Sequence, residues 1–302
     1  MLVEGLFSTL FPSACRFCDA PLENISRLPV CEDCLARAMY VPTRGASCFI
    51  CGERVLAGRF APESVGGELV GESPASTRAL ACGMCERQRP PFERALAYGP
   101  YDGALRDLVH LLKYARVHTA TPVLGRMLAE VIVGLGIEGD AQLRMEPEKI
   151  LVIPVPLYRG KQKQRGFNQA LEVTRAALKL MAPVARGKYE LAPERLLRVR
   201  DTASQTGLTR YQRRENVRGA FVAVDPDTLH GATVLLVDDV FTTGTTVTEC
   251  AKVLRRAGAA RVYVATVARV LKNDAALLEP DVVHEDEFEQ DEPATKGMAA
   301  HA

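Results

Sequence analysis

The residues of this chain best suited to chemistry are two adjacent carboxylates, Asp238 and Asp239, and the threonine-rich loop that follows them. Residues 234–237 form a continuous apolar run, which is typical of a parallel strand covered on both faces. The carboxylates therefore lie at the carboxyl end of a strand, where ligands bind in open α/β sheets. The loop consists of Thr242, Thr243, Gly244, Thr245 and Thr246.

This loop directly precedes a predicted helix. Apolar residues recur on one helical face from Val247 to Ala257, and Gly258 is placed to end the helix. A helix N-terminus offers N–H groups and the positive end of its dipole to an anion, and Gly244 lets the backbone approach closely. The loop therefore predicts a monophosphate site. The two carboxylates are placed to accept hydrogen bonds from sugar hydroxyls or to hold Mg²⁺.

Two other interpretations of the acidic pair compete with a phosphorylated-sugar site. Acidic pairs at strand ends also occur in Walker-B strands and in phosphoacceptor domains, but no GxxxxGK[ST] segment precedes this one. A pair that only caps a helix would not require the TTGTT segment that follows. The phosphorylated-sugar site explains more of the pattern than either alternative.

Two basic segments accompany the motif. Residues 150–156 predict a second apolar strand, and its prolines end regular pairing. A loop is predicted next, before a helix from Asn168, and it carries four cations suited to a diphosphate: Arg159, Lys161, Lys163 and Arg165. Residues 200–221 are polar and basic with little early periodicity, which predicts a mobile flap.

At these segments the chain resembles the phosphoribosyltransferases that use 5-phosphoribosyl-1-diphosphate (PRPP), and more narrowly the ComF family of competence-linked and GntX-like homologues. The similarity spans about residues 92–270 and rests on LKYARVHTATPVLG, VPVPLYRGKQKQRGFNQA, TASQTGLTRYQRRENVRGAF and TVLLVDDVFTTGTT. It implies a type I phosphoribosyltransferase fold, with Asp238 and Asp239 at the ribose hydroxyls and the threonine loop around the 5-phosphate. It also implies that Arg159 and Lys161 belong to a diphosphate loop, and that a flexible cover includes Gln205, Arg210, Arg213 and Arg214.

The chemistry of PRPP indicates which groups such an enzyme needs. Breaking its C1–O bond leaves positive charge on the ribose and negative charge on the diphosphate, so cations and Mg²⁺ should face the leaving group. An acceptor nitrogen then attacks C1, and no protein nucleophile is required. None of the five histidines lies in a recognised catalytic motif, and His110, in an apolar helical stretch, is predicted to be structural. The sequence does not indicate the acceptor.

A second signal lies at the amino-terminal end, where eight cysteines form four consecutive CxxC pairs: Cys15, Cys18, Cys31, Cys34, Cys48, Cys51, Cys82 and Cys85. Two such pairs complete one tetrahedral Zn²⁺ site, so eight cysteines predict two structural zinc ions. Short loop closure favours pairing the first CxxC with the second and the third with the fourth, while crossed pairing stays open. Complete thiolate coordination leaves no open position for chemistry.

Disulfides and thioredoxin-like redox chemistry are the alternatives for these cysteines. The chain begins MLVEGLFSTLFP without a basic signal-peptide region, and no apolar run approaches the length of a membrane span. These features predict a cytoplasmic protein with no membrane span, in which thiols stay reduced. Four CxxC pairs in series favour metal over redox catalysis. Cys250 is predicted to be a buried small apolar residue.

Composition and charge predict two modules and a tail. At 302 residues, with 47% hydrophobic and 25% charged residues, the chain has an ordinary globular composition. Residues 1–91 are predicted to form a double zinc-ribbon-like module with a polar insertion at residues 58–77, and residues 92–272 to form the phosphoribosyltransferase domain. Residues 159–218 carry fifteen Lys and Arg against five Asp and Glu. Residues 279–292 carry eight acids, so the tail at residues 273–302 is predicted to be disordered.

Within the second module, strands are predicted at residues 93–101, 150–156, 233–237 and 261–268, the last closing the sheet. Helices are predicted at residues 104–114, 122–135, 168–180 and 247–257. Strands that alternate with helices predict a parallel sheet.

Three classes of function follow from these features. The first is a transferase that moves phosphoribosyl from PRPP to an unidentified acceptor. The second is a non-catalytic PRPP sensor that binds single-stranded DNA, and possible partners in competence are implied by the resemblance. The third is an adaptor that docks protein partners. The basic charge supports nucleic acid only weakly, because diphosphate needs the same cations and few aromatic residues are interleaved for stacking.

Overall fold

The computed structural model describes residues 14–22, 28–39, 47–55, 81–113, 118–137, 149–202 and 209–271. These residues form a five-stranded sheet in the order β1-β7-β6-β2-β3. Its strands are β1 (Arg94–Pro100), β2 (Ile150–Pro154), β3 (Tyr189–Leu191), β6 (Thr233–Phe241) and β7 (Arg261–Arg269). Every neighbouring pair in this sheet is parallel, which confirms the predicted α/β class.

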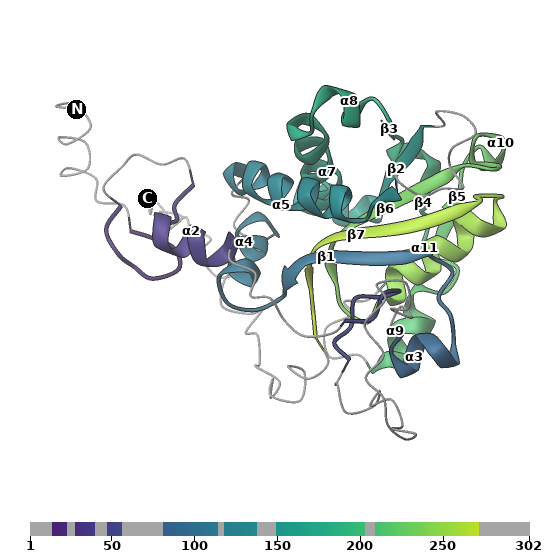
Figure 1. The fold of residues 1–302 in the computed structure, drawn as a ribbon, viewed down its shortest axis with the longest axis horizontal. Coiled ribbons are helices and arrows are strands. Elements are labelled where there is room, and N and C mark those ends of the chain that lie inside the picture. The colour runs from purple at the N-terminus through teal and green to yellow at the C-terminus, as the bar shows by residue number, and fades with distance from the viewer. Residues whose placement is uncertain are drawn as a thin grey trace, which may run out of the picture.

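Helices cover both faces of the sheet, which explains why its central strands are apolar on both sides. Leu235 and Val237 pack with the buried residues of α4 (Gly103–Lys113), α5 (Thr121–Gly134) and α7 (Gln169–Leu180). Val234 and Leu236 pack on the other face with α11 (Thr245–Arg256). Figure 1 shows α5 and α7 on one side of the strands and α11 on the other.

Smaller elements surround this core. Strands β4 (Leu196–Arg198) and β5 (Phe221–Ala223) form an antiparallel pair outside the main sheet. Helix α9 (Arg210–Val217) lies between them in the chain. The remaining short helices are α6 (Arg159–Arg165), α8 (Pro183–Arg186) and α10 (Pro226–Leu229), with 3-10 turns η2 (His118–Ala120) and η5 (Pro193–Arg195).

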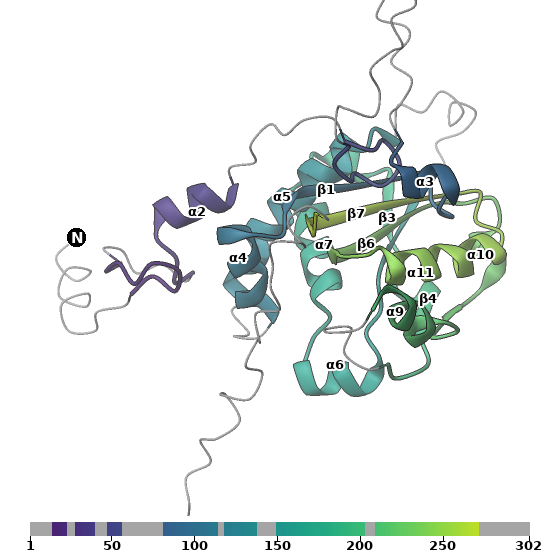
Figure 2. The ribbon, with the colours of Figure 1, turned by 90° about the horizontal axis from the view of Figure 1, so that it is seen from below.

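The cysteine-rich part contains α2 (Glu32–Met39) and α3 (Gly83–Arg87), and its two halves lie on opposite faces of the sheet. Cys15 and Cys34 pack into the core on the α4, α5 and α7 face. Cys48, Cys82 and Cys85 pack into the core on the α11 face. In Figure 2, α2 lies beside α4 and far from α3. The predicted domain boundaries stay predictions, and the insertion at residues 58–77 and the tail at 273–302 lie outside the described residues.

The predicted strands and helices of the second module are confirmed to within four residues at each end. Two details were wrong. Residues 159–165 form helix α6 and not a loop. Strand β7 lies inside the sheet, and β1 takes the edge beside it. The segment predicted as a flap contains helix α9 and the first residue of strand β5, and its mobility stays a prediction. Within the described ranges, no helix has both the length and the apolar character to cross a membrane.

Candidate functional site

The acidic pair lies where the order of the sheet reverses. From β2 the chain continues to β3, at one edge of the sheet. From β6, the neighbour of β2, it continues to β7, toward the opposite edge. The β2–β6 pairing ends at Pro154 and Val237, while β6 stays paired with β7 as far as Phe241 and Arg269. Asp238 and Asp239 therefore lie within β6, just past the end of β2. Such switch points are where open α/β sheets bind ligands.

The two carboxylates face opposite sides of the sheet, because successive residues of a strand alternate. Asp239 lies on the same face of the sheet as Leu235 and Val237. Its Oδ2 lies 3.0 Å from Nζ of Lys113, the last residue of α4. Each of these two side chains is only 17% exposed. Burial favours the neutral amine, but the Asp239 carboxylate outweighs this effect and raises the pKa of Lys113, so the lysine is charged.

Asp238 has a different environment. It shares the face of Val234 and Leu236, and its Oδ1 accepts a hydrogen bond from the Asp239 N–H at 3.0 Å. Burial and then the charge of Asp239 raise the pKa of Asp238 to about 7, against the opposing effect of Lys113 and Arg198. The strand end therefore carries one ion-paired carboxylate and one that titrates near neutral pH.

The threonine loop turns directly into α11, as predicted. Gly244 caps the helix in a left-handed conformation with φ of 72°, and the first helical hydrogen bond runs from the Thr248 N–H to the Gly244 carbonyl. The N–H groups of the first turn precede that bond and lie at the positive end of the helix dipole. The hydroxyls of Thr243 and Thr245 lie 2.7 Å apart. This arrangement has the donors that a phosphate requires.

The predicted diphosphate residues lie on α6, which contains four cations, no acid and no buried residue. Arg159 is exposed, whereas Lys161 is half-buried and donates from Nζ to the Thr202 carbonyl at 3.0 Å. The Arg198 guanidinium in turn donates to the Thr202 hydroxyl. Lys161 therefore ties α6 to the segment that leads into the predicted cover.

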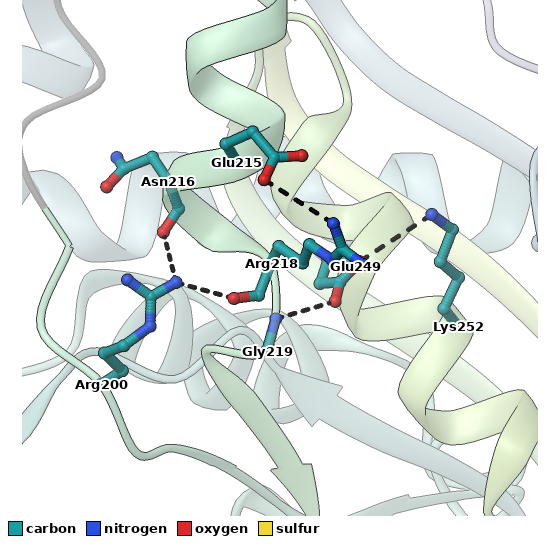
Figure 3. A network of polar contacts seen from close by, with 7 residues as sticks. All are labelled: Arg200, Glu215, Asn216, Arg218, Gly219, Glu249 and Lys252. Carbon is teal, nitrogen blue, oxygen red and sulfur yellow. Dashed lines mark hydrogen bonds and ion pairs between the residues drawn. The ribbon is translucent and has the colours of Figure 1, made fainter.

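The far end of that cover is anchored to α11. Arg200 Nη2 donates to the carbonyls of Asn216 and Arg218 at 2.9 and 2.7 Å, and the Gly219 N–H donates to Glu249 Oε1 at 3.1 Å (Figure 3). Helix α9 also has a capping box between Thr209 and Gln212. These contacts join the carboxyl end of α9 to α11 and cap its first turn.

The four residues assigned to the cover differ in what the structure describes. Gln205 lies outside the described residues, and the side chain of Arg210 is not described. Arg213 is half-buried and Arg214 is exposed, both on α9.

Sequence reasoning missed Lys113 and Arg198. Lys113 ends an amphipathic helix, where a cation is commonplace, and only the fold brings it to Asp239. His110, three residues earlier, has Nε2 2.8 Å from Tyr101 Oη. Burial and the charges of Arg106 and Lys113 lower the pKa of His110. This partly buried, hydrogen-bonded histidine agrees with the predicted structural role.

The eight cysteines gather as two clusters. The first cysteine cluster is Cys15, Cys18, Cys31 and Cys34, and the second is Cys48, Cys51, Cys82 and Cys85. The sulfur atoms of each cluster lie within 4.8 Å of one another, which confirms the sequential pairing of CxxC motifs. All eight are free thiols and not disulfides, and Cys250 is buried as predicted.

Both clusters fit a tetrahedral metal ion such as Zn²⁺. Burial opposes ionisation, but N–H donation from Cys31 and Phe17 lowers the pKa of Cys15 to about 6. Hydrogen bonds from Cys51 and Cys85 lower the pKa of Cys48. In each cluster an arginine also approaches a sulfur: Arg37 Nη2 is 2.9 Å from Cys34 Sγ, and Arg269 Nη2 is 3.9 Å from Cys51 Sγ. Without a metal, these two sulfurs hold their protons: burial raises the pKa of Cys34 to about 12, and Cys48 raises the pKa of Cys51 to about 11. Zinc binding therefore has to release these protons, as it does at other thiolate sites.

Comparisons with known proteins agree with this geometry. Residues 184–293 match the phosphoribosyl transferase domain family. The chain is 32% identical over 261 residues to the DNA utilization protein YhgH of Salmonella typhimurium, covering 86% of this chain and 98% of that protein. It is 33% identical over 193 residues to Competence protein F of Haemophilus influenzae, covering 63% of this chain and 79% of that protein. The chain belongs to the ComF family.

In this ComF-family chain, the matched domain includes β6, the threonine loop and α11. Among solved structures, the chain is similar to a glutamine PRPP amidotransferase from B. subtilis, at 26% identity and a TM-score of 0.29. That likeness covers 50% of this chain and 26% of the other.

Proposed function

We propose that this protein binds PRPP with Mg²⁺ and transfers its phosphoribosyl group to a nitrogen acceptor. One observation carries the proposal: a carboxylate pair and a threonine-lined helix N-terminus lie together at the switch point of a parallel sheet. The carboxylates can accept hydrogen bonds from hydroxyls, and the helix N-terminus can bind a phosphate. A ribose 5-phosphate presents both groups.

In this proposal, the loop from Thr242 to Thr246 holds the 5-phosphate through N–H groups and hydroxyls. Asp238 and Asp239 accept hydrogen bonds from the ribose hydroxyls, with Lys113 holding Asp239 in place. Arg159 and Lys161 supply positive charge toward the diphosphate. Bound Mg²⁺ would neutralise part of the charge on that leaving group.

The bond change needs no covalent intermediate with the protein. The acceptor nitrogen forms a bond to C1 as the C1–O bond to diphosphate breaks with its electron pair. The protein contributes position and charge, which account for most of the catalysis in comparable group transfers.

Calorimetry with PRPP and Mg²⁺ tests the site. The double variant Asp238→Asn/Asp239→Asn should bind PRPP at least roughly tenfold more weakly, because a hydrogen bond to a charged group contributes about 1.5–3 kcal/mol. Asp227→Asn, an exposed carboxylate on α10, is the control and should bind like wild type. Tight PRPP binding that survives the double change would remove the site assignment.

Release of diphosphate in the presence of a panel of purines, pyrimidines and amines tests turnover. Acceptor-dependent release that the double variant loses would support the transferase. Binding without release for any acceptor would favour a PRPP sensor, the second candidate function.

The sensor candidate includes binding of single-stranded DNA. Helix α9 exposes Tyr211, at 73% of its surface, next to the cations of the same helix. An exposed aromatic beside cations is the pairing that single-stranded nucleic acid requires. Relatives named DNA utilization protein and Competence protein F add support. A function in the cytoplasm is consistent with the reduced thiols.

Fluorescence anisotropy with a labelled oligonucleotide tests this candidate. Tyr211→Ala and Arg214→Ala should each weaken binding, and the arginine change should also reduce its salt dependence. Lys179→Ala, on α7, is the control for loss of one charge. No binding of wild type at low salt would exclude the DNA function.

A further inference from the structure

The second cysteine cluster is joined to the end of strand β7 by one buried arginine. The guanidinium of Arg269 donates from Nη1 to the Cys51 carbonyl, and its Nη2 lies 3.1 Å from Glu53 Oε2. The side chains of Arg269 and Glu53 are only 8% and 6% exposed. Glu53 also holds the turn of the cluster, because its carbonyl accepts from the Cys48 N–H at 2.7 Å. The geometry of this cluster therefore sets the position of the guanidinium.

The same guanidinium lies over the ring of Phe241, 4.4 Å from its centroid. Phe241 ends β6, directly before the threonine loop, and its carbonyl accepts from the Val270 N–H at 3.0 Å. Its ring also meets Phe92 edge to face, with centroids 6.4 Å apart. The ring is thus held from two sides.

Phe241 in turn supports the glycine of the loop. A Cβ placed on Gly244 would lie 2.5 Å from Cζ of Phe241, so the ring packs directly against the Gly244 backbone. Gly244 is the N-cap of α11, and its φ of 72° sets the direction of the following N–H groups. Contacts therefore run without a gap from the cluster through Arg269 and Phe241 to the proposed phosphate site.

We infer that Arg269 is a positioning residue that couples the second cysteine cluster, and not the first, to the phosphate loop. The ligand in question is the 5-phosphate of a ribose phosphate, so the inference rests on the proposed function. A metal in this cluster fixes Cys51 and Glu53, these fix Arg269, and Phe241 then holds the loop in its binding form. The first cysteine cluster lies on the opposite face and packs with α4 and its neighbours.

Matched arginine variants test the coupling. Arg269→Lys keeps the charge beside Glu53 but loses the planar group that reaches Cys51 and stacks on Phe241. Arg94→Lys is the control, because Arg94 stacks on Phe49, the residue after Cys48 of the same cluster, at 4.7 Å from the ring centroid. Phe241→Leu removes the ring while leaving both ion-pair partners in place.

Three measurements are made on each full-length variant: zinc content, affinity for PRPP with Mg²⁺, and hydrogen exchange of a peptide covering residues 242–250 without ligand. Arg269→Lys and Phe241→Leu should keep two zinc ions, exchange faster in this peptide, and bind PRPP roughly tenfold more weakly, since small misplacements of binding groups have costs of this order. Arg94→Lys should match wild type. Unchanged exchange and affinity in Arg269→Lys with zinc retained would overturn the inference.

Zinc binding and ligand binding must affect each other equally if the two sites are coupled, and this gives a readout that a merely structural arginine would not change. If the cluster favours the binding form of the loop, ligand in the loop must favour the metal-bound cluster by the same factor. Ribose 5-phosphate should therefore strengthen the binding of one of the two zinc ions in an equilibrium competition with a chelating dye, and Arg269→Lys should abolish that effect. Equal zinc affinity with and without ribose 5-phosphate in a wild type that binds it would refute the coupling.

The coupling and the proposed function fail separately. A wild type that binds neither PRPP nor ribose 5-phosphate would refute the proposed function, and hydrogen exchange would still decide whether Arg269 orders the loop. A wild type that binds both ligands but shows no difference between Arg269→Lys and Arg94→Lys would refute only the coupling.

Discussion

Asp238 and Asp239 are neighbours in the chain with different electrostatic roles. Asp239 is held by Lys113, whereas burial raises the pKa of Asp238 from its ordinary value of 3.8 to about 7. Between these two values the folded state holds a proton that the unfolded state releases. Asp238 therefore contributes stability below about pH 4 that is lost as the pH rises toward 7.

Asp238→Asn should consequently stabilise the ligand-free protein more at pH 8 than at pH 5, while weakening PRPP binding. Each unit of pKa shift corresponds to about 1.4 kcal/mol, so the effect is large enough for thermal unfolding at the two pH values to detect. Between pH 5.5 and 7.5, the affinity of wild type for PRPP should rise more than the affinity of Asp238→Asn. In the variant, only the ionisation of PRPP itself should change the affinity. Identical pH profiles would contradict a titrating carboxylate in the site.

The Lys113–Asp239 pair can be compared with an exposed pair of similar geometry. Lys149 and Glu190 lie 3.4 Å apart with side chains 63% and 50% exposed. Lys149→Met should cost at most roughly 1 kcal/mol in urea unfolding, whereas Lys113→Met should cost more, toward the roughly 3–5 kcal/mol of a buried pair that loses one partner. Equal costs would mean that Lys113 is solvated. Direct Mg²⁺ binding to Lys113→Met, absent in wild type, would show that the lysine occupies a cation position.

At the scale of elements, the loop between β6 and α11 depends on one glycine. Gly244 and Gly231 have similar φ values of 72° and 74°, but an added Cβ meets Phe241 only at Gly244 and nothing within 4 Å at Gly231. Either alanine variant should lose roughly 1–2 kcal/mol of stability from the left-handed backbone. Only Gly244→Ala should also lose PRPP affinity, because Phe241 or the loop must move. Calorimetry and thermal unfolding of both variants separate the two effects.

The elements that could be predicted from sequence are those that bury one face, because their apolar residues then recur at regular spacing. Strand β6 and helices α4, α5, α7 and α11 bury regular apolar faces, and their apolar patterns were sufficient. Helix α6 buries no residue, so its sequence has no apolar periodicity and predicts a loop. Strands β3, β4 and β5 have three residues each, too few to show alternation.

Contacts between distant segments were beyond prediction from one sequence. The CxxC spacing was sufficient to predict two clusters because the ligands of each pair are only three residues apart. The contacts of Lys113 with Asp239, and of Arg269 with Cys51, depend on where the fold brings separate segments together. Their residue types carry no local signal, since a lysine at a helix end and an arginine at a strand end are ordinary. The roles assigned to Arg159, Lys161 and the cover stay predictions.

At the scale of the whole molecule, the two cysteine clusters support different halves of the core. The first packs with α4, α5 and α7, and the Tyr98 hydroxyl of β1 donates to the Met39 carbonyl at the end of α2, at 2.7 Å. The second packs with α11, and the Ile50 carbonyl accepts from the Ala95 N–H at 2.7 Å on the edge strand β1. Each cluster thus packs a different part of the amino-terminal segment against a different face of the sheet.

Metal analysis should therefore find two zinc ions per chain, and each cluster should lose its ion independently. Cys18→Ser and Cys82→Ser should each retain one ion, because removing one of four thiolates from a closed site weakens binding sharply. Hydrogen exchange should rise around α2 and α4 in Cys18→Ser. In Cys82→Ser it should rise around α3, β1 and the loop at residues 242–246, because the second cluster reaches that loop through Arg269 and Phe241. Loss of both ions from either variant would show that the two faces unfold as one cooperative unit, and one ion in wild type would mean that one cluster binds no zinc.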